Sequence, residues 1–147
     1  MRIDVIAAVE IRRPRAEVAA YMTDPANDPT WIGGVREVRM ETPPPLRAGS
    51  RVARVAGFLG RRVEYVNEVT ELDPGRVLDM RSVKAPFPMR ITYTFADGGA
   101  DGTATVVRNR VRGDPGGFFA LFGPLLGPLV RRSVQGDLER LRYVLDR

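Results

Sequence analysis

Residues 128–147, PLVRRSVQGDLERLRYVLDR, carry the pattern that decides the fold of this chain. At 100° per residue their apolar side chains fall on one narrow stripe with the arginines outside it, which predicts an amphipathic helix packed on an apolar surface. The stripe consists of Val130, Val134, Leu138, Leu141, Val144 and Leu145. At about 1.5 Å per residue the helix is roughly 28 Å long, enough to run the length of a small domain. We therefore expect the rest of the chain to be built around it.

Most of the chain before this helix alternates apolar and polar residues, as β-strands do. The first such run, Ile3 to Ile11, precedes two short helical stretches that begin at Pro14 and Asn27. Six further strands are predicted at 35–41, 50–58, 62–72, 76–83, 89–95 and 103–112. Their connections are too short for parallel crossovers, so consecutive strands must pair antiparallel. The sequence predicts an α+β fold, with a seven-stranded antiparallel sheet wrapped around the long C-terminal helix and two short helices after the first strand.

The less charged strand faces, which the helix must cover, combine apolar and polar side chains. Tyr65 shares a face with one amide, and Met89 and Tyr93 share an apolar face of their own strand. The polar members of these faces are Asn67, Thr103, Thr105 and Asn109. An unpaired buried amide costs about 1–3 kcal/mol, so a solid core rarely holds two. Two interpretations stay open: the amides anchor a ligand in a cavity, or they bond to each other or to water.

Composition excludes several classes of chemistry. The chain contains neither cysteine nor histidine, so it has no disulfide, thiol nucleophile or thiolate metal site and lacks the commonest general base. We expect no metal, no cofactor and no catalytic residue that a motif would identify. The net charge of +5 comes from 23 basic residues, of which Lys84 is the only lysine. These residues are scattered along the chain rather than gathered in one patch, so we expect no nucleic-acid binding.

The start of the chain indicates where the protein acts. Asp4 and Glu10 lie within its first apolar run, which therefore resembles neither a signal peptide nor a transit peptide. No window approaches the roughly 20 apolar residues of a spanning helix. We expect a cytoplasmic protein, and no feature of the chain indicates an oligomeric state.

The order of these elements, together with several short motifs, resembles the START-like (SRPBCC) superfamily, specifically its polyketide cyclase/dehydrase and lipid-transport branch. The motifs are Arg13-Pro14, Glu17-Val18, Asp24 and Trp31 at the front, Gly60-Arg61, Glu68 to Arg76 (EVTELDPGR) and Gly102-Thr103 in the centre, and Asp137-Leu138 with Leu141 at the end. The resemblance spans essentially all of residues 1–147 and implies one domain with the Bet v 1-like helix-grip fold, in which a curved sheet grips the C-terminal helix around an apolar pocket. It carries over no reaction, because members of the superfamily share the fold and not the site.

Three further features each admit two interpretations. The apolar segment 118–130 is either a fixed lid or a mobile gate that touches a membrane surface, with Arg131 and Arg132 meeting anionic head groups. Asp137 lies on the apolar stripe, so it either pairs with a strand arginine at the margin of the sheet or acts as an acid in the pocket. Trp31 is predicted to plug the end of the grip beside the short helices rather than to serve as a stacking platform.

The favoured hypothesis is a carrier or sensor that holds a small hydrophobic molecule, such as a lipid, acyl chain or polyketide-like ring system, between the helix and the sheet. The predicted ligand-binding residues are Tyr65, Asn67, Met89, Tyr93, Asn109, Phe119, Phe122 and Val134. One alternative is a cofactor-free polyketide cyclase or aromatase that folds its substrate by shape, with tyrosine or arginine assisting. A second alternative is a partner-binding subunit with a filled core.

Overall fold

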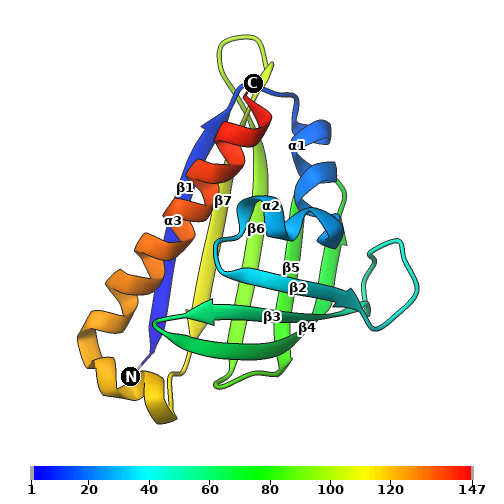
Figure 1. Ribbon diagram of the computed structural model, residues 1–147. Coiled ribbons are helices and arrows are strands. Elements are labelled where there is room, and N and C mark those ends of the chain that lie inside the picture. Colours follow the sequence, from blue (N-terminus) through cyan, green and yellow to red (C-terminus); the bar gives the residue numbers. More distant parts are fainter. Residues whose placement is uncertain (1, 147) are drawn as a thin grey trace.

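The computed structural model describes residues 2–146 and shows one antiparallel sheet curled around a long C-terminal helix (Figure 1). The strands are β1 (Ile3–Ile11), β2 (Val35–Met40), β3 (Arg51–Phe58), β4 (Arg61–Asp73), β5 (Val77–Lys84), β6 (Met89–Gly98) and β7 (Ala104–Gly113). The helices are α1 (Arg15–Met22), η1 (Pro25–Asn27), α2 (Asp28–Trp31), η2 (Gly117–Leu125) and α3 (Leu126–Leu145), where η marks a 3₁₀-helix. The predicted α+β helix-grip fold is confirmed.

The strand order in the sheet is β1-β7-β6-β5-β4-β3-β2, and every neighbouring pair is antiparallel. Five of the six pairings join strands that follow each other in the chain, as their short turns require. The sixth joins β1 to β7, with Ile3 opposite Gly113 and Ile11 opposite Thr105. The β4–β5 pair carries two register shifts, at Val66/Asn67 and at Val69/Glu71. Such bulges bend strands, and Figure 1 shows that the sheet is curled.

Helix α3 lies along β1 and is fastened to it by side chains (Figure 1). The Gln135 amide donates to the Ala8 carbonyl at 2.9 Å and accepts from the Ala8 N–H at 3.3 Å, so it satisfies an edge strand that has no further strand beside it. At the end of the helix, Asp146 accepts a hydrogen bond from the Arg12 N–H at 2.7 Å. The helix is therefore held at its middle and at its C-terminus.

Two clusters of buried side chains form the core. The larger one joins the helix to the sheet through Leu138 and Leu141, both fully buried, and includes Val107, Ile11 and Trp31. The smaller one gathers Ile3, Phe119 and Leu126 at the opposite end of the helix, beneath η2. Trp31 is 1% exposed, and its role as a plug stays a prediction.

Some predicted details are wrong. The helix begins at Leu126 rather than at Pro128. Pro128 fits within the first turn, because the N–H groups of the first turn have no partner within a helix and proline lacks only that group. Thr103 was expected on an inward strand face, but it lies before β7 and is exposed, with its hydroxyl bonded to Asp101. Thr105 is fully buried and donates to the Arg13 carbonyl, so it belongs to the core rather than to a ligand site.

Candidate functional site

A cavity of about 180 Å³ lies between α3 and the concave face of the sheet. Its walls come from the α2–β2 connection, from strands β3 to β7, from the β5–β6 loop, from η2 and from α3. Most of its lining side chains are apolar, with Phe58, Val63, Phe87, Ile91 and Val111 among them.

Seven of the eight predicted ligand-binding residues line the cavity: Tyr65, Asn67, Met89, Tyr93, Asn109, Phe119 and Val134. Phe122 is the exception. It packs edge-to-face on Phe118, with ring centroids 5.5 Å apart, in the cluster beneath η2. The structure thus brings together residues from β4, β6, β7, η2 and α3, while their binding of a ligand stays a prediction.

Arg54, which lines the cavity, belongs to a buried ion pair that was not predicted from the sequence. Arg54 of β3 donates from Nε to Asp28 Oδ2 of α2 at 2.5 Å, and the two side chains are only 7% and 2% exposed. Burial raises the pKa of Asp28, against the opposing effect of Arg54. Burial alone would lower the pKa of Arg54, but the nearby Asp28, Tyr65 and Tyr93 raise it. The guanidinium therefore stays charged, and its two terminal amino groups have no hydrogen-bond partner among residues 2–146.

Two tyrosines lie next to this pair. Tyr65 faces Arg54 across the β3–β4 ladder, and Tyr93 packs edge-to-face on Trp31 with ring centroids 5.9 Å apart. Burial raises the pKa of both phenols, so both are neutral and available as hydrogen-bond donors. Neither has a hydrogen bond within the described part of the chain.

The two inward amides do not satisfy each other. Both polar atoms of the Asn67 side chain and Oδ1 of Asn109 are buried without a protein partner within residues 2–146, and Nε1 of Trp31 is in the same state. Asn109 lies opposite Tyr93 in the β6–β7 ladder, whereas Asn67 lies in β4. The interpretation in which the amides bond to each other is therefore wrong. Buried polar groups are normally paired, so these atoms can recognise polar groups of a bound molecule.

Asp137 projects from α3 into the margin of the cavity. Its Oδ1 accepts a hydrogen bond from the Gly33 N–H at 2.8 Å and lies 3.7 Å from Nη1 of Arg140. The prediction of an ion pair with a strand arginine is wrong, because the cation comes from the next turn of the same helix. Burial raises the pKa of Asp137 to about 6, although Gly33 and Arg140 act in the opposite direction.

Arg54 could have been found from the sequence. In β3, Arg54 lies on the same strand face as Val52 and Ala56, and this face points toward the concave side of the sheet. In most other strands the arginines lie on the opposite face from the apolar residues. A charged residue on the buried parity of a strand indicates a buried partner. Nothing in the sequence identifies that partner, because Asp28 lies in a four-residue helix more than twenty positions earlier.

A larger groove of about 430 Å³ lies outside β2–β4 and makes a poorer candidate. Its lining includes Glu37, Arg39, Arg51 and Glu64, all exposed, so a ligand there would remain in contact with water. No three acidic side chains within residues 2–146 are placed to hold a metal ion. The described helices include none that is both long and apolar enough to cross a membrane.

The sequence matches the family model described as polyketide cyclase / dehydrase and lipid transport over residues 2–146. The chain belongs to this family. No sequence among the curated proteins matches it. The family and the fold together fit an SRPBCC ligand-binding domain.

Several solved structures share the fold of the chain. TTHA0849 from Thermus thermophilus superposes with a TM-score of 0.83 at 20% identity, covering 97% of this chain and 96% of that one. A START superfamily protein from Mycobacterium smegmatis gives 0.82 at 12% identity, covering 97% of both chains. The Zhui aromatase/cyclase from Streptomyces sp. R1128 gives 0.81 at 16% identity, covering 100% of this chain and 95% of that one. At such identities the likeness establishes the fold alone.

Proposed function

We propose that the protein binds a small, largely apolar molecule in the cavity and serves as its carrier or sensor. The observation that carries this proposal is the set of unpaired polar atoms on Asn67 and Asn109, buried in a largely apolar wall. Leaving such atoms unpaired costs about 1–3 kcal/mol each, and a ligand with a hydrogen-bonding group offsets that cost.

The chemistry of the wall describes the ligand. An apolar body would contact Met89, Ile91 and Phe119, and a carbonyl, hydroxyl or carboxylate would meet Arg54 or the tyrosines. The volume of about 180 Å³ lies below the roughly 300–1,000 Å³ of sites for drug-sized ligands. In this conformation the ligand is therefore compact, with a size nearer to one or two rings than to a long acyl chain.

Native mass spectrometry of the freshly purified protein, followed by titration with an apolar fluorescent probe, tests this proposal. We expect stoichiometric probe binding to the folded protein. Met89→Ala enlarges the cavity on its apolar side and should change the affinity for the probe. Asn109→Leu should weaken only those ligands that carry a hydrogen-bonding group, by about 5- to 100-fold, because a lost polar partner leaves that group unpaired. If neither substitution changes the affinity for any ligand, binding in the cavity is refuted.

A second candidate function, a cyclase or aromatase that works by shape control, is supported by Asp137 and Arg54 in the same wall. A carboxyl with a pKa of about 6 can exchange protons near neutral pH, and a guanidinium can stabilise an enolate. One structural neighbour is named an aromatase/cyclase. Incubation with a poly-β-ketone mimic should then yield a cyclised product. In Asp137→Asn the rate of cyclisation should fall while the mimic still binds. The third hypothesis, a partner-binding subunit with a filled core, receives no support from a structure with this cavity.

A further inference from the structure

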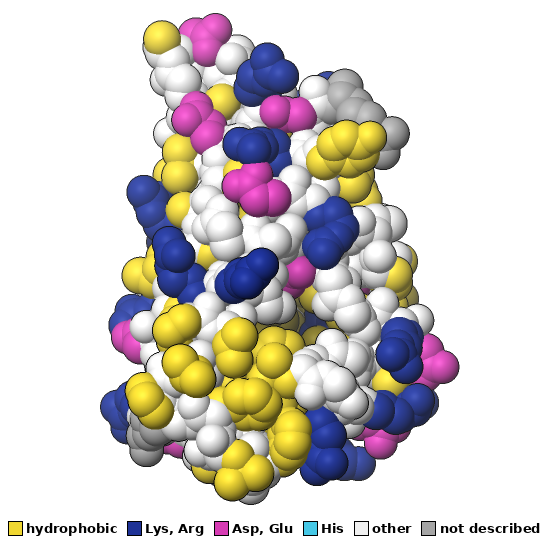
Figure 2. Space-filling model, turned by 60° about the vertical axis from the view of Figure 1, so that its left-hand side comes forward, with side chains coloured by type: hydrophobic (Ala, Val, Ile, Leu, Met, Phe, Trp, Pro, Cys, Tyr) yellow, Lys and Arg dark blue, Asp and Glu magenta, His cyan; other side chains and the backbone are white. Residues whose placement is uncertain are grey.

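The segment that begins with η2 carries apolar side chains on both of its faces. Toward the protein, Phe119 and Leu126 are 5% and 1% exposed. Toward solvent it presents an apolar tip, which we define as the exposed residues Ala120, Leu121, Pro124, Leu125 and Pro128. Leu121 is 81% exposed and Leu125 is 65% exposed, which makes them two of the few large hydrophobic side chains on the surface. Figure 2 shows hydrophobic side chains gathered at this end of the molecule.

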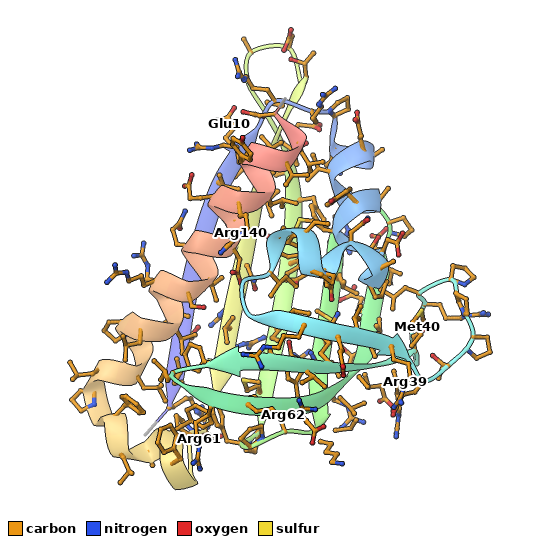
Figure 3. All side chains as sticks on the ribbon, in the orientation of Figure 1. Glu10, Arg39, Met40, Arg61, Arg62 and Arg140 are labelled. Atoms are coloured by element: carbon orange, nitrogen blue, oxygen red, sulfur yellow. The ribbon has the colours of Figure 1, made fainter. Side chains whose placement is uncertain are left out.

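Basic side chains flank the apolar tip. Arg131 and Arg132, both exposed, follow it on the first turns of α3. Arg61, at the β3–β4 turn, lies with its guanidinium 4.2 Å from the centre of the Phe118 ring, and Figure 3 places it beside η2. No acidic residue occurs between Asp114 and Asp137. Figure 2 shows lysine and arginine side chains on either side of the hydrophobic patch.

The apolar tip lies directly outside the cavity wall. Phe119 lines the cavity and contacts Phe58 and Phe87, with ring centroids 5.9 and 5.5 Å away. Val130, two residues after Pro128, lines the cavity as well. A surface that held the tip would therefore lie against the apolar end of the cavity.

We propose that this end of the molecule docks on a bilayer that contains anionic lipids, with the apolar tip in the interfacial region and the arginines against the head groups. Interfacial binding combines buried apolar area with attraction to anionic lipid, and the tip with its flanking arginines supplies both. A protein partner would need acidic groups around an apolar groove, whereas a bilayer presents this combination on any anionic patch. Docking itself does not depend on ligand binding. Its consequence, that the ligand-binding cavity is brought to the lipid boundary, rests on the proposed function.

The test is co-sedimentation of the full chain with vesicles of phosphatidylcholine alone and of phosphatidylcholine mixed with phosphatidylglycerol. We expect binding to the mixed vesicles, weakening as salt rises, and little binding to the neutral ones. Leu121→Glu with Leu125→Glu should abolish it. Arg131→Gln with Arg132→Gln should weaken it about 25-fold, taking roughly fivefold for each arginine near a membrane surface. These side chains are exposed, so both variants should unfold as the parent does.

Matched controls change the same chemistry elsewhere. Ile6→Glu with Val83→Glu alters two exposed apolar residues away from the tip, and Arg39→Gln with Arg108→Gln removes two exposed arginines. Both controls should bind vesicles as the parent does.

Equal binding to neutral vesicles, equal losses in the controls, or no binding at all would overturn the proposal. Self-association without lipid that the Leu121/Leu125 variant abolishes would also overturn it, in favour of a second copy of the chain. The fluorescent probe titration on the same variants separates membrane docking from ligand binding, because a variant that loses vesicles and keeps the probe has lost docking only.

Discussion

At the scale of single residues, Arg54 both lines the cavity and forms a buried ion pair with Asp28. Removing one member leaves the other charge buried and unpaired. We expect Arg54→Met to lower the free energy of unfolding by about 3–5 kcal/mol. The double variant Arg54→Met with Asp28→Asn should lose less than Arg54→Met alone, since no uncompensated charge remains. Chemical denaturation of the two single variants and the double variant measures the coupling, and strictly additive losses would contradict a direct pair.

Asp137 should make stability depend on pH. Its pKa is raised from 3.8 to about 6 in the folded protein, so between these values the folded state binds more protons than the unfolded state. The stabilisation is fully present below pH 3.8 and is lost as pH rises through about 6. The difference amounts to about 2–3 kcal/mol at 1.36 kcal/mol per pH unit.

Denaturation of the parent and of Asp137→Asn from about pH 3.5 to about pH 7.5, a window that reaches from below the unfolded pKa to above the raised one, checks this expectation. The parent should lose stability relative to the variant as pH rises. Glu139→Gln, an exposed change on the same helix, serves as the control and should keep the slope of the parent. Parallel curves for the parent and Asp137→Asn would show that Asp137 titrates alike in the folded and unfolded states.

At the scale of the elements, α3 joins the sheet through the buried side chains of Leu138 and Leu141. Leu138 is fully buried between the helix and the sheet, so Leu138→Ala should cost about 2–5 kcal/mol in unfolding free energy, as buried leucine truncations do. Glu139→Ala, on the exposed side of the same turn, should change it by less than about 0.5 kcal/mol. A loss below about 1 kcal/mol for Leu138→Ala would mean that the space around the side chain collapses easily after truncation.

At the scale of the whole molecule, the excess of arginine is spread over a surface where many of the charges are paired. Arg51 and Arg81 share Glu68, Arg90 binds Asp79, and Arg110 binds Asp4 in a bidentate pair. Each such pair makes an arginine less available to neutralise a phosphate, and the absence of nucleic-acid binding stays a prediction.

We expect Arg108→Gln with Arg110→Gln to change the unfolding free energy by no more than about 1 kcal/mol, because exposed pairs contribute little. Probe binding should stay the same. Filter binding of DNA and RNA at low salt should detect no tight complex with the parent. A salt-sensitive complex that this double variant abolishes would show that the outer face binds nucleic acid.

The strands, the long helix and the antiparallel pairing of consecutive strands follow from local signals in the sequence. The alternation in 89–95, the turn chemistry of Asp73-Pro74-Gly75 and the apolar stripe of 128–147 are local signals, and short turns leave consecutive strands little choice but to pair antiparallel. The inward parity of Tyr65, Asn67, Met89, Tyr93 and Asn109 follows from the same alternation, so residues that line the cavity were predicted without coordinates.

Only the tertiary structure decided which distant groups meet. The β1–β7 pairing, the Arg54–Asp28 pair and the bond from Gly33 to Asp137 join residues far apart in the chain, through contacts that no local pattern specifies. Phe122 was misplaced because the backbone of η2 turns at Gly123, with φ of 56°, and neighbouring aromatic residues cannot be assigned to a face without that geometry. The cavity itself depends on how far the bulged sheet stands from α3, which is a property of packing rather than of any residue's own preference.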